Sequence, residues 1–209
     1  AAAGAAALVL NAQAGVDTVA RRLMELAASR RLCRLVIINR IDADGEHLAE
    51  LLEQVRAAFG RECLPLNLPA DGGKSVADCF FSLSDKRPDF STVEAAHTAM
   101  IDQVVELDED LMRLYLEQGE AISVGQLHDP FERALRDGHL VPVCFVSAAS
   151  GAGLRQLLQI LARLMPDPTE GNPPEFLQGE GSQARPVPVS TDPLAHFIGH
   201  VFKVNVDPY

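Results

Sequence analysis

Two short, wholly apolar runs dominate the hydrophobic pattern of the chain. The first covers residues 35–38 (Leu-Val-Ile-Ile) and the second residues 140–146 (Leu-Val-Pro-Val-Cys-Phe-Val). Runs that are apolar at every position are typical of strands buried on both faces, which occur in parallel sheets covered by helices. Residues 5–11 predict a third buried strand. The pattern therefore predicts an α/β fold built on a parallel sheet.

Amphipathic helices are predicted between these strands. One runs over residues 18–28 with Asp17 or Thr18 as its N-cap, a second over 46–59, and a third from Leu154 to Pro166. Their predicted inward-facing stripes are, in chain order, Val19, Leu23, Leu26 and Ala27; Leu48, Leu51, Leu52, Val55 and Phe59; and Leu154, Leu157, Leu158, Leu161, Ala162 and Met165. Strands that alternate with helices predict a right-handed, doubly wound parallel sheet.

The alternation breaks within residues 65–138. The elements predicted there are an edge strand with two prolines over 64–69, a β-turn at 71–74, a strand over 76–83, and helices near 92–107, 109–117 and 130–136. Gly138 follows the last helix at a helix-terminating position. We expect these residues to form an α+β subdomain inserted between the two apolar strands.

The last part of the chain predicts a separate unit. Residues 167–193 are rich in Pro, Gly and polar side chains, which predicts a linker, and residues 194–209 predict the first strand or strands of an incomplete β domain. The expected division is therefore a sheet domain over 1–64 and 139–166, the insert over 65–138, the linker, and the β segment.

Charge and cysteine usage limit the classes of partner. A net charge of −11 and a pI near 4.9 argue against a broad nucleic-acid surface, which needs clustered Lys and Arg. The four cysteines stand singly in apolar runs, as buried residues in a reducing compartment do. No apolar run reaches the roughly 18 residues that span a bilayer, and the opening residues lack the basic region of a signal peptide. We expect a cytoplasmic protein that does not enter a membrane.

Polar residues arrive where the first apolar run ends. Asn39, Arg40 and Asp42 form the pattern Asn-x-x-Asp at the end of that strand, where open α/β sheets bind ligands. Guanine offers two parallel donors, N1–H and its exocyclic amine, and a fixed carboxylate such as that of Asp42 accepts both. Adenine would leave that carboxylate unpaired, at a cost of about 1–3 kcal/mol. In this interpretation the Asn39 amide fixes the loop and the base edge, and Arg40 lies against the ring or the ribose.

The same residues have a simpler interpretation. Asn and Asp are both favoured at helix N-caps, so Asn39 and Asp42 could cap the helix that follows. The second apolar run bears on this choice, because it ends in the small residues Ser147, Ala148 and Ala149. Small side chains let backbone N–H groups approach a flat ligand closely. An ordinary strand-to-helix loop explains this segment alone, but the two elements in this order favour a guanine site.

The chain resembles the elongation factor G family of translational GTPases from end to end. The stretches that carry the resemblance are residues 9–16, 39–42, 110–116, 142–148, 202–204 and 207–209. The resemblance implies the later half of a Ras-like (P-loop NTPase) GTP-binding domain, a three-layer parallel sheet with an inserted α+β subdomain. The start of a β-barrel domain would follow it.

The resemblance also implies a ligand, a site and partners. Residues 39–42 match the family's guanine-reading Asn-Lys-x-Asp, and the Ser-Ala element at residue 147 supplies a backbone donor to the guanine carbonyl oxygen in that family. The guanine-binding residues implied are Asn39, Arg40, Asp42, Ser147, Ala148 and Ala149, with GTP or GDP as ligand. The parent protein would act on the ribosome in translation, and residues 65–138 would contact the acidic-stalk protein of the large subunit.

Two departures from the family limit what this chain can do. Arg40 stands where the family usually has Lys, and Arg cannot reproduce an ammonium that reaches toward the phosphate loop. The chain also has no Gly-x-x-x-x-Gly-Lys-Ser/Thr sequence, so the loop that wraps phosphates and helps to hold Mg²⁺ is missing. We expect no catalytic residue and no metal ligand here, and no GTP hydrolysis by this chain alone.

Two further patterns favour a structural interpretation over a chemical one. Lys74 after Gly72 and Gly73 resembles the tail of a phosphate loop but suits a β-turn better, and the spacing of His196 and His200 would suit zinc only on a helix. Two alternative functions stay open at this point. One is a non-catalytic module that docks to a ribosomal or regulatory protein, and the other is a different nucleotide-binding α/β enzyme such as a kinase or ATPase.

Overall fold

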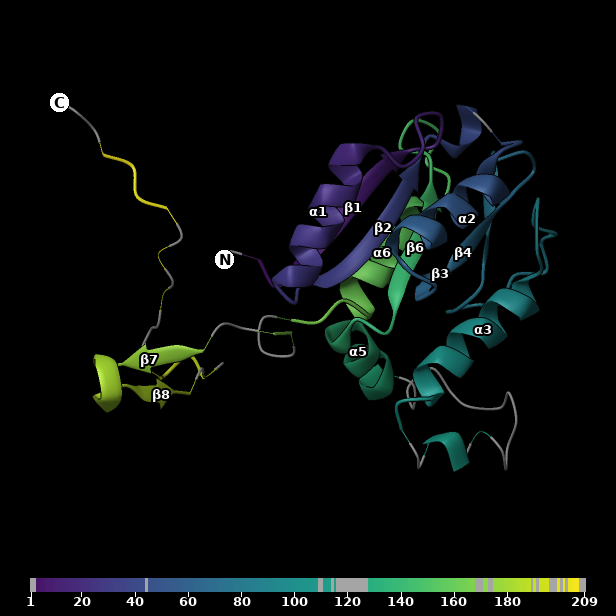
Figure 1. Cartoon of the computed structure of the whole chain (residues 1–209). Helices are drawn as coiled ribbons and strands as arrows, with labels where there is room; N and C mark the ends of the chain where they lie inside the picture. The colour runs from purple at the N-terminus through teal and green to yellow at the C-terminus, as the bar shows by residue number, and fades with distance from the viewer. Residues whose placement is uncertain are drawn as a thin grey trace.

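The fold is an α/β sheet domain with an inserted segment and a small separate hairpin (Figure 1). The computed structural model describes residues 3–43, 45–108, 111–113, 115, 128–167, 171–172, 175–188, 190, 192–195, 199, 201 and 203–206. Its helices are α1 (Thr18–Ser29), α2 (Leu48–Phe59), α3 (Val93–Val105), α5 (His128–Asp137) and α6 (Leu154–Arg163), with short 3₁₀ helices η1 (Ile41–Ala43) and η3 (Gly181–Gln183). Its strands are β1 (Ala5–Asn11), β2 (Cys33–Asn39), β3 (Cys63–Pro65), β4 (Asn67–Ala70), β5 (Ser75–Asp78), β6 (Val141–Val146), β7 (Phe176–Gln178) and β8 (Arg185–Val187).

The main sheet has four parallel strands in the order β1-β2-β6-β3. The two wholly apolar runs become β2 and β6, which pair with each other at the centre of the sheet. Their carboxyl ends are level, because Asn39 lies opposite Val146. The loops after β1, β2 and β6 gather at one edge of the sheet, at the top in Figure 1. The polar residues that follow both central strands therefore lie at the same edge.

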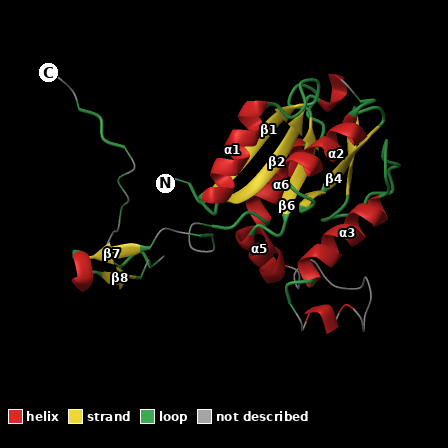
Figure 2. Cartoon of the chain, viewed as in Figure 1, coloured by secondary structure: helices red, strands yellow, loops and turns green. Residues whose placement is uncertain are grey.

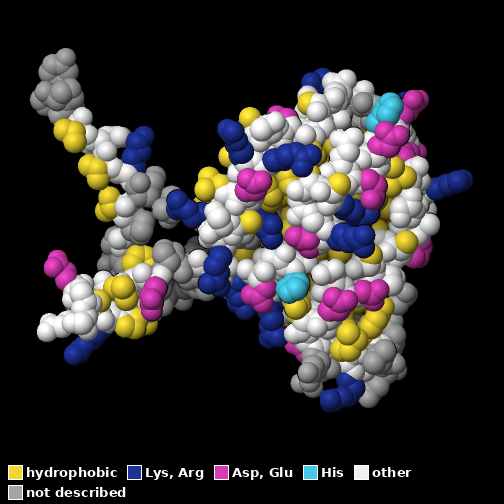
Figure 3. All heavy atoms as spheres, viewed as in Figure 1, with side chains coloured by type: hydrophobic (Ala, Val, Ile, Leu, Met, Phe, Trp, Pro, Cys, Tyr) yellow, Lys and Arg dark blue, Asp and Glu magenta, His cyan; other side chains and the backbone are white. Residues whose placement is uncertain are grey.

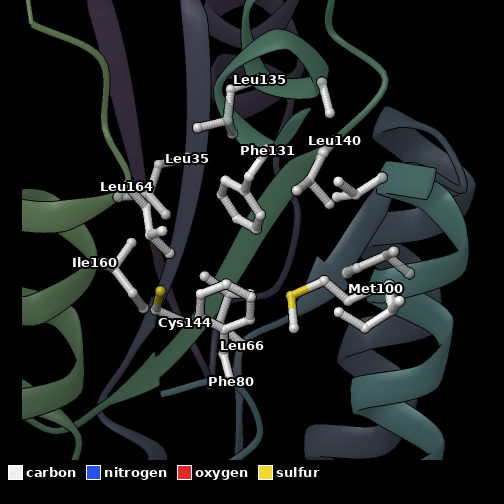
Figure 4. Packing of buried hydrophobic residues seen from close by; sticks show 14 of the residues in the cluster. Leu35, Leu66, Phe80, Met100, Phe131, Leu135, Leu140, Cys144, Ile160 and Leu164 are labelled. Carbon is white, nitrogen blue, oxygen red and sulfur yellow. The ribbon is translucent and has the colours of Figure 1, made fainter. Parts of the chain in front are cut away.

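Helices cover both faces of the sheet, which explains why the central strands are apolar throughout (Figure 2). In β2, Leu35 and Ile37 pack in one cluster with α3, α5 and α6, whereas Val36 and Ile38 pack in another with α1 and α2. Figure 4 shows the first cluster, in which Phe131 of α5 lies between the sheet and α3. The predicted three-layer parallel architecture is confirmed.

The inserted segment begins where β3 ends. The single edge strand predicted over 64–69 is two strands, because β3 closes the main sheet while β4 pairs with β5 in an antiparallel hairpin. The hairpin packs on α3 through an apolar cluster of Leu68, Ala77, Cys79, Val93 and Ala96. The helix predicted over 109–117 falls largely outside the described residues.

Two predicted inward-facing stripes are wrong in part. α1 buries Ala20, Met24 and Ala27, while the predicted residues Val19, Leu23 and Leu26 are 61%, 50% and 53% exposed. The reason is the position of β1, which is an edge strand and not the buried strand predicted, with Val9 59% exposed. In α6, Ile160 is buried, whereas the predicted Leu158 and Leu161 are exposed.

The segment after α6 contains more structure than a linker. Within residues 167–193, β7 and β8 form an antiparallel hairpin that encloses η3. Between residues 194 and 209, the described positions include no strand, and the His196 and His200 pair lies outside them. The division of the chain into domains stays a prediction. Among the described helices, none combines the length and apolar character needed to cross a bilayer.

Candidate nucleotide site

The ends of β2 and β6 are joined by a side chain that the sequence singles out. Asn39 Oδ1 accepts a hydrogen bond from the backbone N–H of Ala148 at 3.0 Å and another from that of Arg40 at 2.8 Å. This hydrogen bond joins two residues that lie 109 positions apart in the sequence. The two loops predicted to read the base therefore lie side by side at the carboxyl end of the sheet.

Asp42 is exposed in the loop that follows β2. It belongs to η1, next to the fully buried Ile41, which anchors the turn in the core. The following helix, α2, begins only at Leu48, and its N-cap residue is His47. Asn39 and Asp42 therefore do not cap α2, which removes the simpler interpretation of these two residues.

Arg40 has an unusual backbone. Its φ of +66° lies in the left-handed region, which costs a non-glycine residue roughly 1–2 kcal/mol. The conformation turns the chain sharply between Asn39 and the buried Ile41, and the Arg40 side chain is exposed. Strain of this kind persists where the surrounding structure holds the loop, and it is often found at functional sites.

The loop after β6 is compact because its first residue bonds to its own loop. Ser147 is buried, its N–H donates to the Ala152 carbonyl at 2.9 Å, and its Oγ accepts from the Ser150 N–H at 3.2 Å. Ala148 and Ala149 stay exposed. Gly153 ends the loop with φ of +73°, at a place where a Cβ would collide with the Phe145 carbonyl oxygen. The small residues thus permit a tight turn that leaves two alanines facing solvent.

Sequence reasoning missed the residues that support these loops from the insert. Asn67 hydrogen-bonds to the backbone of Phe145, and Gly73 lies against the backbone of Ile41. A polar residue within an apolar alternation and a Gly-Gly pair in a turn were visible signals. Their meaning depended on knowing that the hairpin lies beside the sheet.

The four cysteines are packing groups and not reactive thiols. All four cysteines are free and buried, and burial raises the pKa of the Cys63 and Cys79 thiols to about 12. Burial likewise raises the pKa of Cys33 and Cys144, so all four thiols stay protonated and act as packing groups. In the part of the chain that the structure describes, no cluster of His, Cys, Asp or Glu could hold a metal ion.

Comparison with known families bears on the choice between the remaining classes. A family model described as the elongation factor Tu GTP binding domain matches residues 1–167. The chain belongs to this family of translational GTPases. Membership in the elongation factor Tu GTP-binding domain family agrees with the parallel sheet, and it supports guanine nucleotides as the ligand class.

Relatives of this GTP-binding domain family agree with the assignment. The chain is 30% identical over 220 residues to an elongation factor G-like protein of Mycobacterium tuberculosis, covering 100% of the chain and 30% of that protein. It is also 30% identical to peptide chain release factor 3 of Streptococcus agalactiae, covering 98% of the chain and 38% of that protein. A crystal structure from Thermus thermophilus matches with a TM-score of 0.68 and 31% identity, covering 81% of the chain and 27% of that structure. The chain spans about a third of the length of the relatives it matches.

A change at Asn39 tests whether the link between the loops matters. Asn39→Ala removes the acceptor of the Ala148 N–H, and the loss of a hydrogen bond of this type corresponds to roughly tenfold weaker nucleotide binding. We expect this loss in the GDP affinity of a protein in which this chain is joined to a phosphate-binding loop, measured by fluorescence with a labelled nucleotide. Ser150→Ala removes the acceptor of the Ala152 N–H in the same loop without touching Asn39, and it should change affinity less than about twofold.

Proposed function

We propose that this chain is the guanine-recognising part of a ribosome-associated translational GTPase of the elongation factor G type. The longer protein would bind and hydrolyse GTP during translation elongation. Segments outside this chain would hold the phosphates and Mg²⁺, since this sequence contains no phosphate-binding loop. In this proposal the chain supplies base recognition and the inserted subdomain.

The observation that carries the proposal is the hydrogen bond between Asn39 and Ala148, which joins the two loops at one edge of the sheet. Beside it the Asp42 side chain is exposed, where it can accept the two parallel donors of guanine. In the proposal, Ala148 and Ala149 line the base edge and Arg40 covers the ring or the ribose. Because the Ala148 N–H is donated to Asn39, Ala149 presents its backbone N–H to the base carbonyl oxygen. Ser147 holds the loop in shape from beneath.

The insert over 65–138 would serve as the docking surface for a ribosomal stalk protein, as the resemblance implies. The net charge of −11 argues against direct contact of the chain with nucleic acid. Figure 3 agrees on the face that it displays, where acidic and basic side chains are interspersed. In this proposal the helices of the insert provide binding and take no part in the chemistry.

Nucleotide competition tests the proposed function. The longer protein is titrated with fluorescent GDP, and unlabelled GDP, ADP or UDP is then added. We expect GDP to displace the probe and ADP to fail at a hundredfold excess. Displacement by ADP would favour a kinase or ATPase, and an absence of nucleotide binding would favour the protein-interaction module.

A further inference from the structure

The two candidate base-reading loops are both supported by the same element, the β4–β5 hairpin. After β3 ends at Pro65, the chain stays on β6, where the Leu66 N–H donates to the Val143 carbonyl at 3.0 Å. Asn67, fully buried, then uses its side chain in place of a strand backbone. Its Nδ2 donates to the Phe145 carbonyl at 3.0 Å, and its Oδ1 accepts from the Phe145 N–H at 2.8 Å. The hairpin thus fixes β6 two residues before Ser147.

The turn of the β4–β5 hairpin contacts the loop that carries Asp42. Gly73, in the turn between β4 and β5, lies so close to the Ile41 carbonyl that a Cβ would collide with it, and that Cβ would also lie 3.4 Å from the Asp42 nitrogen. A Cβ on Gly45, which follows the Asp42 turn, would lie 2.5 Å from the Gly72 carbonyl oxygen. The turn and the Asp42 loop are therefore packed backbone against backbone.

A carboxylate from a third segment fixes the shape of the turn. Asp89 Oδ1 accepts from the Gly72 N–H at 2.9 Å, and Oδ2 accepts from the Gly73 N–H, also at 2.9 Å. The backbone of Asp89 is itself held to β4, since its N–H donates to the Pro69 carbonyl at 2.8 Å. The turn is thus a braced element that presents Gly73 to the Asp42 loop in one position.

We propose that the β4–β5 hairpin positions the base site, with Gly73 and Asp89 setting the place of Asp42 and Asn67 setting the β6 end. The inference rests on the proposed function, since it assigns a role in guanine recognition. None of these residues needs to touch the base. They act as positioning residues for the Asp42 carboxylate, whose contact with the exocyclic amine separates guanine from hypoxanthine.

A matched pair of adjacent glycines provides the test. Gly72 and Gly73 both have left-handed backbones, with φ of +67° and +77°, so alanine strains the turn at either position. A Cβ on Gly72 meets open space, whereas one on Gly73 meets the Asp42 loop. The readout is the ratio of the dissociation constants for IDP and GDP in the longer protein, because IDP lacks only the exocyclic amine. Loss of general stability would not change this ratio.

We expect Gly73→Ala to lower the IDP/GDP ratio by roughly tenfold, the equivalent of one lost charge-assisted hydrogen bond, and Gly72→Ala to leave it within about twofold. Asp89→Asn, which replaces one of the two acceptors, should shift the ratio in the same direction, with Asp85→Asn in the same exposed loop as its control. Should Gly73→Ala not fold, Asp89→Asn decides. If the wild type binds GDP and the variants keep its IDP/GDP ratio, this inference alone is overturned. If the wild type binds no GDP, the proposed function is overturned and this inference with it.

Discussion

Replacing Asp42 by Asn is expected to change the base preference of the protein from guanine toward xanthine. The proposed carboxylate accepts two charge-assisted hydrogen bonds, each worth about 1.5–3 kcal/mol. Loss of about 2.7 kcal/mol corresponds to roughly 100-fold weaker GDP binding. The Asn amide can donate to the second carbonyl of xanthine, so XDP binding should strengthen. Competition between GDP and XDP for a fluorescent nucleotide measures both changes.

Glu46→Gln is the matched control for this substitution. Glu46 is also exposed, lies four residues further along the same loop, and loses the same charge when it becomes Gln. We expect it to change GDP binding less than about twofold, because an exposed charge contributes little at this range. An Asp42→Asn protein whose preference for GDP over XDP stays at the wild-type value would remove Asp42 from the base site.

Truncation of Phe131 should cause a large loss of stability. Phe131 of α5 is 1% exposed, and its ring centroid lies 5.2 Å from that of Phe80 (Figure 4). It packs in the cluster that joins α3, α5 and α6 to the sheet. Phe131→Ala leaves a cavity there, and we expect the free energy of unfolding to fall by about 3–5 kcal/mol in urea titrations.

Leu158→Ala serves as the control for Phe131→Ala. Leu158 lies on α6 but is 65% exposed, so its truncation removes little packing. The free energy of unfolding of the Leu158→Ala variant should differ from that of the wild type by no more than about 0.5 kcal/mol. A loss at Phe131 of under about 1 kcal/mol would show that the cluster collapses around the gap, and that α5 adds little to the domain.

The parts of the fold that sequence alone predicted are those set by local chemistry. The two apolar runs are buried on both faces because helices cover both sides of β2 and β6. The predicted stripe on α2 is buried in full, and Asp17 caps α1 by accepting from the Ala20 N–H. Capping is readable because it depends on neighbours close in sequence, and a run that is apolar at every position is readable because it needs cover on both faces whichever elements supply it.

The missed parts depend on long-range placement. The stripe of Val19, Leu23 and Leu26 has the spacing of a core face, yet burial would require an element beyond β1 that the described residues do not contain. The supporting contacts of Asn67 and Gly73 likewise depend on the hairpin lying beside the sheet. For the candidate site, the sequence predicted that the two loops would meet and that the Asn39 amide would fix its loop. It did not predict that the Asn39 side chain would accept from the Ala148 N–H of the other loop.

The open flank formed by β1 and α1 has a practical consequence. Val9, Val19, Leu23 and Leu26 present apolar surface beside a strand that has a neighbour on one side only among the described elements. Edges of this kind recruit other chains, and added charge is the usual natural deterrent. The solubility of this chain when produced by itself is therefore limited at this flank. Lysine or glutamate at Leu23 and Leu26 is the natural choice for surface engineering, since Ala20, Met24 and Ala27 carry the packing of α1.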